Sequence, residues 1–366
     1  MNYKVVCSKC GNVENDFSFR CSKCNSILEV KYEYNRSQKL FDKKNKGIRR
    51  YINILPVKKI YTLGEGNTQL ASIKIDGIDN AKLFFKLENQ NPTKTFKDRG
   101  SCIEISKAVE LGIKKVCCAS TGNMGLSVAH YAKHFGINAT IFIGKNANRK
   151  KISRIRKQGA KIVFVDGDFN KALNAAEEYS GKTGAFVCGD YHFRKEGQKT
   201  LAFEVAEQMK FQMPDYLFIP VGNGTLFSGV YKGLEELKSY KLIRNKPRMV
   251  AVQSEKCDPV IVAYRNRKNI KYMKPRTEAD AIAVGYPTFG FETLNAIKGT
   301  KGNAVSVSEK EIESAVRTLE DYGINAELGG GTGFAGFLKM HSNNKKIFKS
   351  KSVAVVITGN NEGRFV

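Results

Sequence analysis

The sequence predicts an α/β fold with a mostly parallel sheet, preceded by a small cysteine-rich module. From residue 60 onward, apolar runs of strand length alternate with patterns typical of helices, as expected for βαβ units. The apolar runs are continuous, which indicates strands buried on both faces of a parallel sheet. With 366 residues, of which 42% are hydrophobic, the chain is long enough for two domains and can bury a sizeable core.

The cysteine-rich module comes first along the chain. Of the nine cysteines, four form two Cys-Ser-Lys-Cys pairs: Cys7, Cys10, Cys21 and Cys24. The pairs are followed by Gly11 and Asn25, residue types that accept a positive φ at the end of a tight turn. Two such turns present four thiolates, the usual ligand set of a zinc ribbon, although iron also accepts this set. We therefore predict a Zn²⁺-binding ribbon over residues 1–30, which needs its metal because so small a fold has little core.

The chain is strongly basic, with 61 Lys and Arg against 35 Asp and Glu and a formal net charge of +26. A positive charge of this size suits three classes of partner: nucleic acid, an anionic membrane surface and acidic small molecules. Positive charge is densest up to residue 60, and residues 31–60 are predicted as a basic linker that includes the candidate nucleic-acid patch Lys43–Arg50. Aromatic residues other than Tyr51 are scarce beside that run, so we expect a solvated surface and no nucleic-acid partner.

Targeting and membrane signals are not visible in the sequence. No run of about 18 apolar residues is present, and Met1–Cys10 is polar and unlike a secretory signal. The sequence therefore predicts a cytoplasmic protein with no membrane partner and with reduced cysteines.

The elements of the α/β body follow in a regular order. Strands are expected at residues 83–87, 116–119, 139–143, 161–165, 216–221, 248–253 and 352–358. Helices are expected at residues 100–111, 123–135, 149–158, 169–179, 226–239, 309–322 and 333–340. In an open parallel sheet, ligands bind beyond the carboxyl ends of the strands, where the helices begin.

Three loops lie at such strand-to-helix junctions. Residues 220–226 contain Gly-Asn-Gly-Thr, so their backbone N–H groups can approach an anion at a helix start, which is typical of a phosphate site or of an ordinary turn. Residues 119–124 place two hydroxyl groups at another helix start, which suits a carboxylate. Residues 91–100 place Lys97 at a helix start, where the helix dipole lowers the pKa of an amine and favours its neutral, nucleophilic form.

The lysine segment Asn91–Gly100 resembles that of fold type II pyridoxal-phosphate enzymes, the group related to the β-subunit of tryptophan synthase. Residues 63–70 (Leu-Gly-Glu-Gly-Asn-Thr-Gln-Leu), 86–93 and 194–200 (Arg-Lys-Glu-Gly-Gln-Lys-Thr) are similar to motifs of the threonine synthase family within that group. A cysteine ribbon at the N-terminus also occurs in part of that family. The resemblance covers residues 61–366 and implies a two-domain catalytic body, with a small mobile subdomain at about 98–185 and a larger subdomain formed by the remainder.

The resemblance also implies a pyridoxal-phosphate-dependent lyase with a role for each matching residue. Lys97 would bind the cofactor covalently and move protons as acid and base. Cofactor contacts are implied for Asn123 at the phenolic oxygen, Thr358 at the pyridine nitrogen, and Gly222, Asn223, Gly224, Thr225 and Leu226 at the phosphate. Substrate contacts are implied for Ser120, Thr121 and Met124 at the carboxylate and for Arg194 at a phosphate.

The leading reaction is the conversion of O-phospho-L-homoserine and water to L-threonine and phosphate. Three alternatives stay open: β-replacement on O-phospho-L-serine, as in cysteate synthases; dehydration of serine or threonine; and, outside enzymes, a zinc-ribbon nucleic-acid-binding protein with a degenerate enzyme body. A homodimer is expected because dimers are common in the family.

Two segments depart from the family pattern. Gly189–Phe193 stands where Asn and Pro are usual before Arg194, and its His192 is expected to be a surface residue. Glu327–Gly333 is rich in glycine where a Glu-Pro-Ala-Ser-Ala helix entry is usual, so we expect these glycines to open room near the cofactor or to loosen the loop. Both departures bear on the substrate and leave the cofactor assignment unchanged.

Overall fold

The structure is a computed structural model that describes residues 2–33, 39–120, 122–145, 149–167 and 169–360, with backbone only for 149–151. The chain forms two compact units, each assembled from two stretches of sequence. Unit 1 comprises Met1–Gly66 and Lys97–Thr200, and unit 2 comprises Asn67–Phe96 and Leu201–Val366. The subdomain expected at about 98–185 falls within unit 1.

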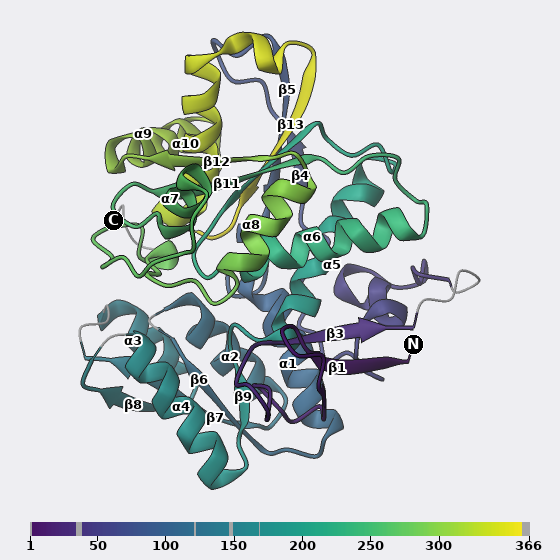
Figure 1. Cartoon of the computed structure of the whole chain (residues 1–366), viewed down its shortest axis with the longest axis vertical. Helices are drawn as coiled ribbons and strands as arrows, with labels where there is room; N and C mark the ends of the chain where they lie inside the picture. The colour runs from purple at the N-terminus through teal and green to yellow at the C-terminus, as the bar shows by residue number, and fades with distance from the viewer. Residues whose placement is uncertain (1, 34–38, 121, 146–148, 168, 361–366) are drawn as a thin grey trace. The chain divides into compact units, whose positions relative to one another are not determined.

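Unit 1 is built on a parallel sheet in the order β8-β7-β6-β9. Its strands are β6 (Lys115–Ala119), β7 (Asn138–Gly144), β8 (Lys161–Val165) and β9 (Phe186–Cys188). Its helices are α1 (Lys97–Glu110), α2 (Asn123–His134), α3 (Arg149–Lys157), α4 (Phe169–Thr183) and the first part of α5 (His192–Gln208). Helix α4 packs on β6 and β7, and α2 packs on β7 (Figure 1), which buries Cys117 and Phe142 in the core.

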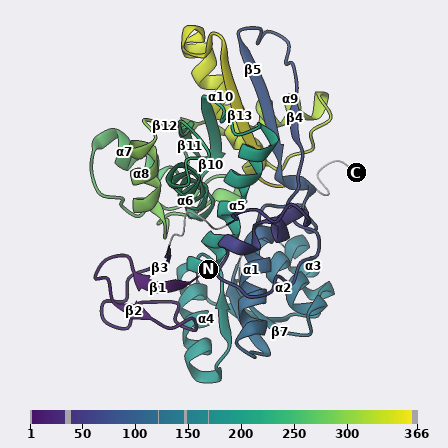
Figure 2. The ribbon, with the colours of Figure 1, turned by 90° about the vertical axis from the view of Figure 1, so that its right-hand side faces the viewer.

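The N-terminal segment forms a separate antiparallel sheet within unit 1, in the order β2-β1-β3 (Figure 2). Its strands are β1 (Tyr3–Cys7), β2 (Val13–Glu14) and β3 (Leu28–Tyr32). Polar contacts tie this sheet to the helices of unit 1: Lys107 Nζ lies 3.1 Å from Asp16, and the Tyr32 hydroxyl donates to Glu196 at 2.6 Å. The module is therefore held against unit 1 and does not stand apart from it.

The segment that follows the module is only partly solvated. Lys43, Lys46 and Arg49 are exposed, in keeping with the expected basic surface. Ile48 and Tyr51, however, are almost fully buried within a 3₁₀ turn. The burial of these two apolar side chains therefore anchors a segment that its charge alone would predict to be a solvated linker.

Unit 2 is built on a sheet in the order β12-β11-β10-β13-β5-β4, parallel except for the antiparallel edge strand β4. Its strands are β4 (Leu70–Ser72), β5 (Ala81–Leu87), β10 (Tyr216–Pro220), β11 (Arg248–Ser254), β12 (Asn303–Val307) and β13 (Lys351–Ile357). Its helices are α6 (Thr225–Ser239), α7 (Pro259–Asn266), α8 (Gly290–Gly299), α9 (Glu309–Asp321) and α10 (Leu328–Asn343). Helix α10 crosses the sheet beside β10 and β13 (Figure 1), and its Phe334 packs edge-on against Phe85 of β5 with ring centroids 5.4 Å apart.

Short 3₁₀ segments complete the described structure: Gly47–Ile54, Glu88–Gln90, Asp280–Ile282 and Lys345–Phe348. No helix in the described part of the chain has both the length and the apolar character needed to cross a membrane.

The predicted α/β class with parallel sheets is confirmed, and two local expectations are wrong. His192 is 3% exposed, so it is a buried residue and not a surface one. The glycines after Glu327 lie inside α10, where a Cβ on Gly330 would stand 2.6 Å from the carbonyl oxygen of Gly359. They therefore permit close packing and do not open room.

Candidate functional site

Lys97 is the first residue of α1, three positions earlier than the helix start predicted from the sequence, and its side chain is half-buried. The next residue, Asp98, is fully buried and accepts a hydrogen bond from the Ser127 hydroxyl of α2 at 2.6 Å. The Lys97 carbonyl accepts a hydrogen bond from Arg194 Nη1 at 3.1 Å. The first turn of α1 is thus fixed from two sides, which orients the lysine.

Arg194 is fully buried at the start of α5 and is surrounded by protein acceptors. In addition to the Lys97 carbonyl, it donates to the Gly189 carbonyl at 2.9 Å, to Ser101 Oγ at 3.1 Å and to the Glu104 carboxylate. Four of its five N–H groups are therefore occupied. A substrate phosphate would have to displace some of these partners, so the geometry favours a positioning role for Arg194 over direct binding.

Glu104 is the carboxylate that faces Arg194, and it is itself buried. It also accepts the backbone N–H of Gly189 at 2.7 Å. Burial raises the pKa of Glu104 to about 7, although the neighbouring Arg194 opposes that rise. The pair links α1 to α5, and both side chains also bind the backbone of Gly189, so residues far apart in the sequence form this link.

The loop after β6 is organised by Ser120. Its hydroxyl oxygen accepts the backbone N–H of Gly122 at 3.1 Å and that of Gly125 at 2.8 Å, so it already caps the first turn of α2. Asn123 is the first residue of α2, and Met124 follows it with 6% exposure. Within the described residues, the Met124 N–H has no protein acceptor, which leaves a donor for an anion. Thr121 lies outside the described residues.

The glycine loop before α6 presents backbone donors. Gly224 has a φ of +81°, and a Cβ there would lie 2.5 Å from Thr293 Oγ1, so only glycine fits. The Asn223 side chain accepts the Thr288 N–H at 2.9 Å, which fixes the loop. The N–H groups of Gly224 and Leu226 have no protein acceptor in the described part of the chain. Thr225, the first residue of α6, is buried beside them.

Such a loop can hold a phosphate. Donors at a helix N-terminus that lack protein acceptors, together with the positive end of the helix dipole, favour a dianion. Gly222 also packs closely, because a Cβ there would lie 3.2 Å from Ile282 Cα. The expected phosphate cradle therefore has the backbone geometry that its ligand requires.

Thr358 follows the last strand of unit 2 and is 5% exposed. Its carbonyl accepts the Phe96 N–H at 3.1 Å, and Thr95 forms an antiparallel bridge with Gly359. The Thr358 hydroxyl has no protein partner among the residues described, so it is available to a ligand atom. The Thr358 backbone is therefore fixed by hydrogen bonds, while its hydroxyl can still bind a ligand.

The four N-terminal sulfur atoms converge. All four Sγ atoms of Cys7, Cys10, Cys21 and Cys24 lie within 4.8 Å of one another, and the Cys7–Cys24 and Cys10–Cys21 pairs are 3.4 Å and 3.6 Å apart. A tetrahedron of sulfur ligands about 2.3 Å from a zinc ion has edges of about 3.8 Å. Gly11 and Asn25 take φ values of +72° and +54°, as the two turns require.

The protonation of these thiols is uneven. Hydrogen bonds from Ser26 lower the pKa of Cys24 to about 6, whereas burial raises that of Cys21 to about 12. A divalent cation between them would hold all four as thiolates, since metal coordination deprotonates a thiol. The residues present therefore fit a tetrahedral metal site.

Sequence reasoning missed two polar features of α5. The Gln198 side chain is fully buried, and neither of its amide atoms has a partner within the described residues. Glu204 pairs with buried Lys86 at 2.5 Å and accepts the Asn67 N–H at 2.8 Å. The only signal for the pair in the sequence was Lys86, a charge inside the apolar run of β5.

A model of the pyridoxal-phosphate dependent enzymes matches residues 61–359. This range covers most of the chain, so the chain belongs to that family of enzymes. Its fold agrees with solved members of the group. A maize serine racemase matches with a TM-score of 0.71 at 24% identity, over 81% of this chain and 89% of the racemase. Threonine deaminase isoform 2 from Solanum lycopersicum matches with a TM-score of 0.70 at 23% identity, over 81% of this chain and 80% of its own.

Within the family, the chain is similar to several threonine synthases. That of Methanocaldococcus jannaschii is 34% identical over 91% of this chain and 86% of its own length. That of Methanosarcina acetivorans is 33% identical over 92% of this chain and 87% of its own. That of Bacillus sp. strain ULM1 is 35% identical over 86% of this chain and 88% of its own. The resemblance expected from the motifs is confirmed.

Proposed function

We propose that this protein is a threonine synthase that converts O-phospho-L-homoserine and water to L-threonine and phosphate. The observation that carries the proposal is the match to threonine synthases at 34% and 33% identity over 91% and 92% of the chain. The ordered motifs around Lys97 and Arg194 support the same reaction.

The residues present fit pyridoxal phosphate. The N–H groups from Gly222 to Leu226, two of which have no protein acceptor in the described region, would hold the cofactor phosphate. Asn123 would hold the phenolic oxygen and Thr358 the pyridine nitrogen. When bound, the cofactor withdraws electrons from the substrate carbons, which makes their protons removable.

Lys97 is the proposed catalytic residue. Its amine would hold the cofactor and would move protons at the α- and β-carbons of the substrate, so that phosphate could leave from the γ-carbon and water could add at the β-carbon. The start of a helix disfavours a positive charge, which favours the neutral amine that this work needs. The contacts of Asp98 and of the Lys97 carbonyl hold the helix turn that carries it.

The loop Ser120–Met124 is proposed to bind the substrate carboxylate. Ser120 Oγ accepts two backbone N–H groups and its hydroxyl donates to the Gly122 carbonyl at 3.5 Å, so we assign the Met124 N–H as the open donor to the carboxylate. The Ser120 hydroxyl would join it by leaving the Gly122 carbonyl. Thr121 contributes its own hydroxyl. Arg194 is proposed to contribute chiefly as a positioning residue. It holds Lys97 and the segment before α5, which the resemblance places near the substrate phosphate.

The N-terminal cluster is proposed to bind one Zn²⁺ through its four thiolates. The sulfur spacing, the two turns with positive φ and the small size of the module support a metal that is structural. A homodimer in the cytoplasm is the assembly and location that we expect for the enzyme.

The test is a panel of four substrates given to the protein loaded with pyridoxal phosphate: O-phospho-L-homoserine, O-phospho-L-serine, L-serine and L-threonine. We expect equal amounts of threonine and phosphate from the first substrate and little product from the others. Phosphate release from O-phospho-L-serine, with an added nucleophile such as sulfite joined at the β-carbon and no keto acid formed, would assign the β-replacement reaction instead. Keto-acid formation from serine or threonine without phosphate release would assign a dehydratase.

A further inference from the structure

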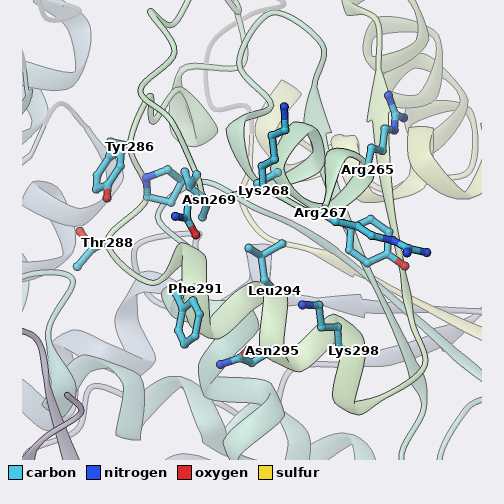
Figure 3. Close-up of a pocket in the computed structure, with 14 residues that line it drawn as sticks. Arg265, Arg267, Lys268, Asn269, Tyr286, Thr288, Phe291, Leu294, Asn295 and Lys298 are labelled. Atoms are coloured by element: carbon cyan, nitrogen blue, oxygen red, sulfur yellow. The ribbon is translucent and has the colours of Figure 1, made fainter. Parts of the chain in front are cut away.

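Unit 2 contains a pocket of about 840 Å³ lined by α7, α8 and the segment between them (Figure 3). None of the residues proposed above for the cofactor or the substrate lines it. Its volume lies within the range of sites for small molecules, which is about 300–1,000 Å³. The pocket is therefore large enough for a ligand of its own.

The pocket is cationic. Arg265, Arg267, Lys268 and Lys298 line it, all four side chains are exposed, and no Asp or Glu is part of the lining. Within the described residues, none of the four forms an ion pair with a carboxylate. Four uncompensated cations around one cavity attract a ligand with several negative charges.

The pocket also offers aromatic surface. Tyr286 is 56% exposed and Phe291 is 69% exposed, unusually high fractions for side chains of this size. In Figure 3, Tyr286, Thr288 and Phe291 lie at one end of the pocket, whereas Arg267 and Lys298 lie at the other. Exposed rings at one end and cations at the other match a ligand with a flat ring and an anionic tail.

Arg267 marks the C-terminal end of α7 beside the pocket. This residue follows the last residue of α7 with a φ of +53°, a left-handed conformation in which glycine or asparagine is usual. The residue ends the helix, and its side chain is among those that line the pocket.

From these observations we propose that the pocket binds a nucleotide. The base stacks on Phe291 and Tyr286, and the phosphates pair with Arg267 and Lys298. Thr288 and the exposed amide of Asn295 supply hydrogen-bond partners for the sugar and the base. No residue of its lining is proposed to contact the amino-acid substrate, although the Thr288 N–H donates to the Asn223 side chain of the glycine loop at 2.9 Å.

The test is calorimetric titration of the full-length, pyridoxal-phosphate-loaded protein with ATP, adenosine and inorganic tripolyphosphate. We expect saturable binding of one ATP per chain, tighter than either fragment and weaker at high salt. The double variant Arg267→Ala/Lys298→Ala and the single variant Phe291→Ala should each weaken ATP binding about tenfold or more. The matched control Lys310→Ala/Arg317→Ala removes two exposed cations of α9 and should leave it unchanged.

Several outcomes would overturn the proposal. One is the absence of saturable ATP binding at millimolar concentration, and another is equal weakening by the control variant. Tripolyphosphate that binds as tightly as ATP would show that the rings play no part. If the wild type does not bind ATP and a pocket variant is monomeric where the wild type is not, this face is a contact between copies of the chain.

A short oligoadenylate distinguishes the two sources of a nucleotide. If ATP binds as tightly as the oligoadenylate, the ligand is a free nucleotide. If the oligoadenylate binds more tightly than ATP, and its binding is weakened by the variants at Phe291 and Lys298, the natural ligand is a nucleotide within a single-stranded nucleic acid. The far-ultraviolet circular dichroism and the cofactor absorbance of every variant should match the wild type, because the substituted side chains are exposed.

Discussion

The residues proposed to bind the cofactor are arranged by different physical means in the two units of this chain. Unit 1 uses side chains: Arg194, Glu104 and Asp98 are buried and hydrogen-bonded around the helix start that carries Lys97. Unit 2 uses backbone: Gly224 and Leu226 present N–H groups that have no protein acceptor within the described residues. The first arrangement holds the helix turn that carries Lys97, the proposed reactive group, and the second leaves backbone donors open for a ligand.

This difference predicts what each unit tolerates. Substitutions in the buried cluster of unit 1 should cost stability first, because they leave polar groups or charges unpaired in the interior. Substitutions in the loop of unit 2 should cost cofactor affinity first, because the donors that the loop offers to the cofactor are backbone N–H groups. The four variants below test this division in order of expected effect.

Lys97→Ala should have the largest effect, a loss of activity of at least about 10²–10⁴-fold, since it removes both the cofactor linkage and the group that moves protons. Phosphate release and the visible absorbance of the loaded protein are the measurements. The control is Lys94→Asn, an exposed lysine in the same loop with a φ of +65° that asparagine also accepts. Activity retained by Lys97→Ala would refute the assignment.

Arg194→Met should destabilise the protein by about 3–5 kcal/mol, because Glu104 and two backbone carbonyls lose their buried donor. Urea unfolding measures this. Arg317→Met, at an exposed position on α9, should change stability by less than about 0.5 kcal/mol. If Arg194→Met kept its stability and raised only the KM of the phosphorylated substrate, Arg194 would be a direct phosphate ligand and the positioning role would be wrong.

Gly224→Ala should cost about 1–3 kcal/mol of stability and weaken pyridoxal phosphate binding about tenfold, because its Cβ would meet Thr293 and the φ is positive. Gly77→Ala is the matched control. Gly77 has a φ of +77° but has open space around its Cβ position, so it tests the backbone strain alone. Equal cofactor affinities in the two variants would contradict the phosphate role of the loop.

Removal of the metal should have the smallest effect on activity, less than about tenfold, with the main loss in the ribbon itself. Elemental analysis should find about one zinc per chain in the wild type and none in Cys7→Ser. Limited proteolysis should then cleave the ribbon of the Cys7→Ser variant. In the control variant Cys257→Ser, which changes a buried cysteine of unit 2, the ribbon should resist cleavage. A wild type without metal would refute the zinc proposal.

Sequence patterns predicted most of the parallel framework because buried strands and amphipathic helices leave a periodic record. The residues of β8, Lys161–Val165, agree at both ends with the expected strand. Helix α5 was missed because it is buried all round from His192 to Ala206, so its apolar residues form no stripe. The first turn of α10 was missed because its glycines read as a loop, whereas they serve close packing.

The site divides in the same way. The glycine loop and the lysine segment are local in sequence, so they could be found as candidates for an anion site and a reactive amine, and the resemblance to the family then favoured these roles over an ordinary turn and a solvated lysine. The partners of Arg194 come from α1 and from the segment before α5, and a contact of this kind has no local signature. Burial of His192 was likewise decided by tertiary packing and not by its neighbours in the chain.

The central claim is that unit 1 supplies the reactive amine of a pyridoxal-phosphate enzyme through Lys97. The most direct measurement is borohydride reduction of the loaded protein, followed by mass spectrometry of its peptides, because reduction fixes the cofactor on the lysine that it binds. The account predicts one modified lysine, Lys97. Modification of another lysine in place of Lys97, such as Lys94 or Lys199, would contradict it.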